Sequence, residues 1–179
     1  IGTLPIVLLG LTFQEFIENQ LRQLWIIGVM LIGFGILLGL ADRFAKKQKP
    51  IEELNLKSGL IFGFGQALAL IPGVSRSGGS ITVGLMMGFT REAAARYSFL
   101  LAIPAVLAAG GYQFLKSYQD LPQDLLFATI AATAVSFVVG YLVIAWLLKY
   151  LTKGSFMPFV IWRVAVGSLL LIALGFGVI

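Results

Sequence analysis

Residues 59–89 read GLIFGFGQALALIPGVSRSGGSITVGLMMGF, an apolar stretch interrupted by a Pro-Gly pair and the polar run SRSGGS at 75–80. Two crossings of a ~30 Å hydrocarbon core would need about 40 helical residues. The 31 residues of this stretch, rising 1.5 Å each, extend only about 46 Å. The stretch is therefore predicted to form a re-entrant helical hairpin, with its polar tip at membrane depth. A single tilted span is the alternative, and Arg76 and the break at Pro72 argue against it.

The composition places this hairpin in a membrane protein. Of the 179 residues, 59% are hydrophobic and 12% are charged, whereas soluble domains carry about 25% charged residues. The fold class predicted is an all-α polytopic membrane protein. Because the chain has no Cys and no His, it cannot form a Cys/His zinc site or a Ser–His pair. The net charge of +5 fits basic loops at an anionic leaflet better than nucleic-acid binding.

Four apolar stretches are long enough to span the membrane, and residues 1–13 are apolar but too short. The four predicted spans are residues 24–41, 97–115, 125–148 and 156–179. The loop 42–58 is rich in Lys and Arg, which predicts a cytoplasmic position, and Lys149 and Lys153 mark a second basic turn. Both basic segments lie on one side only if the hairpin 59–89 enters and leaves the membrane on that side.

The polar tip is predicted to receive an anion. Gly73 would end the first helix, Gly78 and Gly79 would let the backbone turn, and the next helix would begin near 77–80 with unpaired N–H groups. The guanidinium of Arg76 offers a planar fork of donors for phosphate oxygens. The serine hydroxyls of the tip could bind a phosphate or attack it. The candidate catalytic residues are Ser75, Arg76 and Ser80, and the candidate substrate-binding residues are Gln66, Gly73, Ser77, Gly78 and Gly79.

Each candidate also has a structural interpretation. Ser77 or Ser80 could cap a helix, and Arg76 could satisfy carbonyls of the broken helix. Gln66 could reach the tip or hydrogen-bond a neighbouring helix. Arg163, about five residues inside its span, is expected to snorkel to the cytoplasmic interface.

Two sequence blocks carry a family resemblance. GQALALIPGVSRSGGS at 65–80 and REAAARYSFLLAIPA at 91–105 resemble the bacterial undecaprenyl-diphosphate phosphatases of the bacitracin-resistance type. The resemblance implies two inverted repeats, each with a re-entrant helix pair and three spans. Residues 59–179 would be a complete second repeat, and residues 1–41 would be the last spans of a first repeat whose beginning is missing. The implied organisation is a single membrane domain: spans 1–41, the basic loop 42–58, the hairpin 59–89, and three spans in 90–179.

The resemblance also implies a reaction and a place for it. Family members hydrolyse undecaprenyl diphosphate to the monophosphate, which recycles the lipid carrier for peptidoglycan synthesis and confers resistance to bacitracin. Ser75 and Arg76 match the Ser-Arg pair that binds the phosphates, Ser80 stands where the family usually has Thr, and Gly79 replaces the usual Ala. A divalent cation, Mg²⁺ or Ca²⁺, is the implied cofactor. The implied location is the bacterial cytoplasmic (inner) membrane, with membrane lipids as partners, no nucleic acid, and a homodimer as one arrangement allowed.

The family's acidic motif is absent from this chain, so the sequence predicts only the cationic half of the site, no metal ligands within the chain, and little or no activity for the chain alone. A polyprenyl-phosphate flippase is the alternative function, because inverted repeats with re-entrant tips also serve transport. An anion channel with Arg76 at its filter is a weaker alternative, since the ring of charges typical of pores is missing.

Overall fold

The computed structural model describes residues 1–117 and 123–177, and in these residues it contains helices, turns and a single isolated β-bridge but no named strand. The helical fold class is confirmed. The α-helices in chain order are α1 Leu4–Thr12, α2 Gln14–Gln20, α3 Leu24–Phe44, α4 Leu56–Ala67, α5 Arg76–Met86, α6 Arg91–Ser117, α7 Gln123–Leu151 and α8 Met157–Gly175. Two short 3₁₀ turns, η1 Ile51–Glu53 and η2 Leu68–Leu70, join them.

Four of the described helices, α3, α6, α7 and α8, are long and apolar enough to cross a bilayer. They coincide with the four predicted spans, and the chain is a multi-pass membrane protein. The span predicted from residue 97 begins six residues earlier, at Arg91, and its helix continues through Pro104. Large apolar side chains such as Phe137 and Trp162 remain 74% and 70% exposed, as expected for helices whose outer faces meet lipid rather than water.

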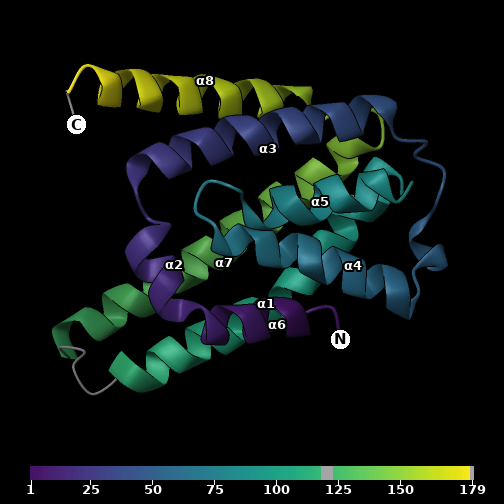
Figure 1. The fold of residues 1–179 in the computed structure, drawn as a ribbon. Helices are drawn as coiled ribbons and strands as arrows, with labels where there is room; N and C mark the ends of the chain where they lie inside the picture. Colours follow the sequence, from purple (N-terminus) through teal and green to yellow (C-terminus); the bar gives the residue numbers. More distant parts are fainter. Residues whose placement is uncertain (118–122, 178–179) are drawn as a thin grey trace.

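The hairpin lies between α3 and α6. Helix α4 has 12 residues and α5 has 11, so each is about 16–18 Å long and neither can cross a ~30 Å core. In Figure 1, α4 begins and α5 ends at the same end of the molecule, where α3 ends and α6 begins. The backbone joins the two ends directly: the N–H of Lys49 donates to the carbonyl of Gly88, and the N–H of Thr90 donates to the carbonyl of Lys49, each at 2.9 Å. The two short helices therefore form the predicted hairpin, and its re-entrant position in the membrane stays a prediction.

The first helix of the hairpin has a start signal in the sequence, before the predicted beginning of the helix. Asn55 and Ser58 form a capping box, in which the Asn55 side chain accepts from the Ser58 N–H and the Ser58 hydroxyl accepts from the Asn55 N–H, both at 2.9 Å. This arrangement satisfies two N–H groups that a helix start otherwise leaves unpaired. Helix α4 therefore begins at Leu56, three residues before the predicted start.

The tip of the hairpin lies past the midpoint of the neighbouring span. Gly73 packs against Ile27 and Met30, close to the start of α3. These contacts stand about 23 Å from the other end of α3, whose 21 residues extend about 31 Å. A Cβ on Gly73 would stand 2.6 Å from the carbonyl oxygen of Ile27, so the tip reaches this depth only because the residue there has no side chain.

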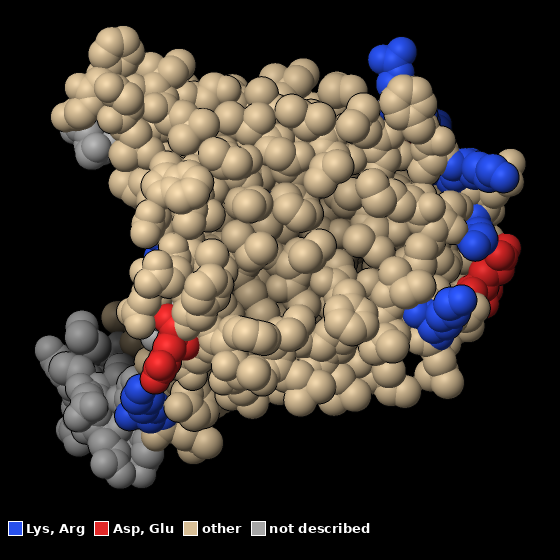
Figure 2. All heavy atoms as spheres, viewed as in Figure 1, with Lys and Arg blue, Asp and Glu red and all other residues tan. Residues whose placement is uncertain are grey.

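Charged residues gather at the ends of the molecule. Figure 2 shows Lys, Arg, Asp and Glu at the two ends of the visible face and a broad band of other residues between them. The end with more charge is the one where α3 ends, α4 and α8 begin and α7 finishes (Figure 1). The basic loop 42–58 and the turn that contains Lys153 therefore lie on the same side, which satisfies the condition set by the sequence.

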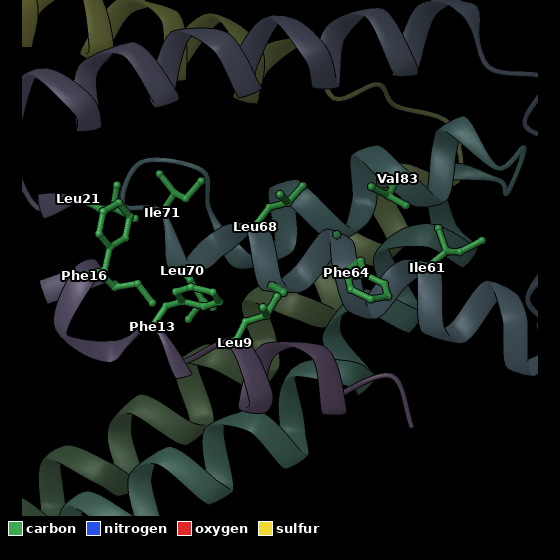
Figure 3. Close-up of a pocket in the computed structure, with 13 residues that line it drawn as sticks. Leu9, Phe13, Phe16, Leu21, Ile61, Phe64, Leu68, Leu70, Ile71 and Val83 are labelled. Carbon is green, nitrogen blue, oxygen red and sulfur yellow. The ribbon is translucent and has the colours of Figure 1, made fainter. Parts of the chain in front are cut away.

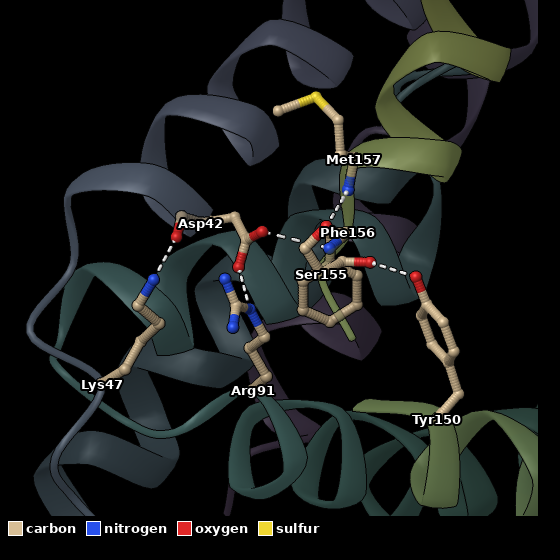
Figure 4. Close-up of polar contacts among 7 residues, drawn as sticks. All are labelled: Asp42, Lys47, Arg91, Tyr150, Ser155, Phe156 and Met157. Atoms are coloured by element: carbon tan, nitrogen blue, oxygen red, sulfur yellow. Dashed lines mark hydrogen bonds and ion pairs between the residues drawn. The ribbon is translucent and has the colours of Figure 1, made fainter. Parts of the chain in front are cut away.

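A buried carboxylate ties the helices together at this end. Asp42, 3% exposed, accepts a hydrogen bond from Arg91 Nε at 2.5 Å and one from the backbone N–H of Phe156 at 3.1 Å (Figure 4). The ammonium of Lys47 donates to the Asp42 carbonyl. Asp42 thus joins the last turn of α3 to the first turn of α6 and to the start of α8, and each carboxylate oxygen has a donor.

The same contact fixes α8 against α3, and small residues let the two helices approach closely. Gly35 and Gly39 of α3 meet the Cβ of Arg163 and the side chain of Val160, and their lack of a side chain permits this close approach. This pairing, the most extensive between any two described helices, brings Arg163 alongside the hairpin.

Candidate functional site

The turn at the tip is made by residues with unusual backbone angles. Gly73 has a φ of +95° and Ser75 a φ of +71°. A non-glycine residue at positive φ typically stores about 1–3 kcal/mol of strain and is found preferentially at functional sites. Gly78 and Gly79, predicted to form this turn, instead lie in the first turns of α5, which begins at Arg76. The prediction of their role in the turn was wrong.

The two glycines serve helix packing. A Cβ on Gly65 of α4 would stand 3.1 Å from the carbonyl oxygen of Gly79, and a Cβ on Gly79 would overlap that of Gly65. The backbones of α4 and α5 therefore touch at this point. The first turn of α5 is held rigidly against α4, which fixes the direction in which its N–H groups point.

Ser75 is the N-cap of α5. Its Oγ accepts from the N–H of Gly78 at 3.2 Å, and its carbonyl accepts from the N–H of Gly79 at 2.9 Å. Neither Ser77 nor Ser80, the residues predicted as alternative caps, has this position. The helix itself supplies no acceptor for the N–H groups of Arg76 and Ser77, so these two donors and the positive end of the helix dipole remain available to an anion.

Arg76 follows the cap directly and is exposed. Its side chain lines an apolar groove between α1 and α6. Arg76 is thus the first residue of α5, where the helix leaves N–H groups without an acceptor, and it borders space that a ligand can occupy. This position is the one expected for a phosphate-binding arginine.

Arg163 is a second guanidinium at the tip, and the sequence analysis did not anticipate it. Its Nη2 donates to the carbonyl of Gly73 at 2.7 Å, and its Nη1 is 3.3 Å from where a Cβ of Gly78 would stand. The expected snorkelling to the cytoplasmic interface was wrong. Its buried Nε has no hydrogen-bond partner among the described residues. The signal in the sequence was an arginine inside an apolar span.

Ser80 points away from the turn. It is 0% exposed, and its Oγ lies 2.6 Å from the Oγ of Ser98 in α6. The Ser80 hydroxyl also donates to the carbonyl of Arg76 at 2.9 Å. A hydroxyl has one proton, so Ser98 is the donor when Ser80 bonds Arg76. In this geometry Ser80 links α5 to α6, and its catalytic role stays a prediction.

Gln66 is also fully buried, at 0% exposure, and neither atom of its amide has a hydrogen-bond partner among the described residues. It lies one turn after Phe62, on the same face of α4, and the Phe62 ring packs on Tyr97 of α6 with centroids 4.8 Å apart. The described hydrogen bonds therefore connect the Gln66 amide neither to the tip nor to a neighbouring helix, and its predicted role in substrate binding stays untested.

A second apolar pocket, of about 430 Å³, lies on the other side of α1 (Figure 3). Side chains from α1, α2, α4, η2 and α5 line it, including Phe13, Phe64 and Val83, and none of the lining residues is charged. It contains no group that could bind or activate a phosphate. The chemistry of the site is therefore confined to the tip and the groove beside it.

The tip does not fit a metal cation. Its donors are guanidinium, backbone N–H and serine hydroxyl groups, whereas Mg²⁺ and Ca²⁺ require several oxygen ligands with carboxylates among them. No cluster of acidic, His or Cys residues that could hold a metal occurs in the described part of the chain. The arrangement suits an anion.

Comparisons with known proteins show which family the chain is similar to. A family model described as "Bacitracin resistance protein BacA" matches residues 1–169. The chain is 50% identical over its whole length to an undecaprenyl-diphosphatase of Micrococcus luteus and 54% identical to undecaprenyl-diphosphatase 2 of Agrobacterium fabrum. An undecaprenyl-diphosphatase of Kineococcus radiotolerans is 55% identical over 92% of the chain. The chain spans 66%, 64% and 59% of the lengths of these three relatives.

Proposed function

The chain belongs to the family of bacitracin resistance protein BacA, and from that premise we propose that its hairpin tip binds the diphosphate of undecaprenyl diphosphate for hydrolysis. The products are undecaprenyl phosphate and inorganic phosphate. The protein would act in the bacterial cytoplasmic membrane, return the lipid carrier to peptidoglycan synthesis, and confer resistance to bacitracin. The single observation that carries the proposal is the start of α5, where unpaired N–H groups lie beside the exposed Arg76.

The residues of the tip have different roles in binding the diphosphate. The N–H groups of Arg76 and Ser77 and the Arg76 guanidinium offer donors to the phosphate oxygens, where negative charge increases during cleavage of the anhydride. Arg163 supports the tip without being offered to the phosphate directly. Its hydrogen bond to the Gly73 carbonyl holds the turn, and its charge makes the electrostatic potential at the tip more positive. Ser75 is the candidate nucleophile: its Oγ accepts from Gly78 with one lone pair, which leaves the second for attack, and its proton would pass to a general base.

We propose that this tip is the cationic half of the site. Hydrolysis also needs a group that activates water or the nucleophile, and the tip has no carboxylate to do so. The acidic residues, and any divalent cation that they hold, would come from a part of the protein outside the described residues. An inverted repeat would bring such a part to the tip.

The test is release of phosphate from undecaprenyl diphosphate by the full-length protein in detergent with added divalent metal, with and without Arg76→Ala. Loss of a donor that acts in the transition state lowers kcat/KM by about 10²–10³-fold, or ~2.7–4 kcal/mol. Arg96→Ala is the matched control, because Arg96 is an exposed arginine at the charged end of α6. Unchanged turnover by the Arg76 variant would refute the proposal. In vesicles that contain the same protein, movement of the lipid across the bilayer without phosphate release would favour the flippase alternative.

A further inference from the structure

The charged end of the molecule contains a pocket with two cations in its lining. The pocket has a volume of about 340 Å³ and lies where η1, the start of α4 and the end of α5 meet. Lys49 and Lys57 line it, and both side chains are exposed. Glu53 is the acidic residue of the lining, so the cations outnumber the anion. The pocket is therefore positive at the end of the protein that the basic loop assigns to the cytoplasmic leaflet.

The chain holds one of these lysines in place. The backbone N–H and carbonyl of Lys49 are bonded to Gly88 and Thr90, each at 2.9 Å. Its ammonium lies over the ring of Phe89, 5.9 Å from the centroid, an arrangement that attracts a cation to the ring face. Lys49 is thus anchored at its backbone and positioned at its side chain, unlike a lysine on a free loop.

This cationic pocket adjoins the apolar pocket of Figure 3. Ile61 of α4 lines both of them. Figure 3 shows Ile61 at one end of the apolar pocket and Phe16 and Leu21 at the other. The two volumes, about 340 and 430 Å³, lie in the range of ~300–1,000 Å³ that is usual for ligand sites. Together the pockets form a path with a positive mouth and an apolar interior.

We propose that the two pockets bind one anionic phospholipid of the cytoplasmic leaflet. Its phosphate would lie at Lys49 and Lys57, since an ammonium is a compact donor that suits phosphate. Its acyl chain would pass Ile61 and follow the apolar pocket along the outer face of α4. The cytoplasmic leaflet is rich in anionic lipids, which basic segments attract. A lipid bound in this way has its head at the charged end and its chain in the protein interior, as in the leaflet itself.

This site is separate from the hairpin tip and does not depend on the proposed function. Arg76 lines neither pocket. A bound phospholipid would instead fill the apolar space between α4 and the helices α1 and α2, whose side chains form the other wall of that space. The lipid would therefore stabilise the hairpin from its outer face.

The experiment titrates phosphatidylglycerol and phosphatidylcholine with the same acyl chains into the full-length protein in detergent, and native mass spectrometry gives the dissociation constant of the first lipid bound. The double variant Lys49→Gln/Lys57→Gln should raise the constant for phosphatidylglycerol by about 10-fold or more, because each lysine near an anionic lipid contributes roughly 5-fold. The constant for phosphatidylcholine should change much less. Glu53→Gln should act in the opposite direction and tighten the binding of phosphatidylglycerol.

A matched pair of lysines separates a site from general surface charge. Lys46 and Lys153 are exposed at the same end but do not line the pocket, so Lys46→Gln/Lys153→Gln should leave both constants unchanged. Arg76→Ala should also leave them unchanged. An equal loss in the two lysine pairs would overturn the proposal, and so would a loss of phosphatidylglycerol binding in Arg76→Ala, which would move the lipid to the tip.

The apolar part of the site is tested by filling it. Leu68→Trp, in the lining of the pocket of Figure 3, should weaken both lipids, because both have the same chains. Unchanged binding of both would overturn the assignment of the chain. If this variant fails to fold, as judged by its thermal transition, Leu68→Phe takes its place. A full-length protein that binds neither lipid would also overturn the proposal and would mean that another part of the protein, or a second copy, covers the pockets.

Discussion

Two places in this molecule hold an arginine within a mostly apolar structure. They differ in how many hydrogen-bond and charge partners the chain provides there. At the charged end, Arg91 meets the buried Asp42, whose other oxygen accepts from the N–H of Phe156. At the hairpin tip, Arg76 is exposed beside two N–H groups that lack a helical acceptor, and Arg163 has a buried Nε without a partner among the described residues. The first set of contacts is complete and serves the fold. The second is short of acceptors, and a phosphate would supply them.

The largest effect is expected from removing the contacts of Asp42 with Arg91 and Phe156. Asp42→Ala leaves Arg91 without its buried partner and removes the acceptor for Phe156, which should destabilise the fold by about 3–5 kcal/mol. Thermal or denaturant unfolding in detergent measures this loss, with the exposed Glu52→Ala as control. The turnover of the remaining folded protein should be unchanged. A destabilisation below about 1 kcal/mol would mean that Asp42 behaves as a surface ion pair.

The next effect tests whether Arg163 belongs to the tip. Arg163→Gln removes the charge-assisted bond to the Gly73 carbonyl, a loss of about 1.5–3 kcal/mol. The loss should appear as a lower kcat/KM for the lipid substrate, by about 10- to 100-fold. Lys153→Gln, an exposed cation at the cytoplasmic end, is the control. Equal activity of the two variants would mean that Arg163 holds the turn without contributing to turnover.

Ser75 tests the tip further, because its two structural roles have opposite effects on stability: its backbone strain destabilises the fold and its helix cap stabilises it. Ser75→Gly relieves the strain at its φ of +71°, about 1–3 kcal/mol, and loses only a few tenths of a kcal/mol from the cap. The variant should therefore be more stable than the parent by about 1–2 kcal/mol. Its phosphate release should fall, since the hydroxyl is gone. A stabler variant with full activity would remove Ser75 from the list of nucleophiles.

The smallest effect concerns the hydroxyl pair between α5 and α6. Ser98→Ala and Ser80→Ala each remove the 2.6 Å contact between the two side chains, a loss of about 0.5–1.5 kcal/mol of stability. If Ser80 only links the helices, both variants should retain turnover, and the double variant should lose less stability than the sum of the singles. Loss of turnover in Ser80→Ala alone would establish a catalytic role instead.

These regions also separate what sequence reasoning could predict from what it could not. Length and charge predicted the hairpin, because a largely apolar stretch of 31 residues between two basic segments can satisfy the same-side condition only by turning back. The residue types of the tip predicted an anion site. Arg163 and its partner Gly73 are 90 residues apart in the sequence. Only the packing of α8 on α3 brings them together, and the sequence does not show this packing. The burial of Ser80 depends on which face of α5 meets α6, and the sequence of one helix does not specify its neighbour.

The backbone bonds that join Lys49, Gly88 and Thr90 have a consequence for how the protein is made. Because the hairpin starts and finishes at one end, it adds no crossing, and every later helix has the orientation it would have without it. The four spans can therefore be oriented during membrane insertion before the hairpin is in place. The hairpin can then enter late, as one module, between helices that are already set. A change in its length would alter how deep the tip reaches without inverting any part of the protein that follows.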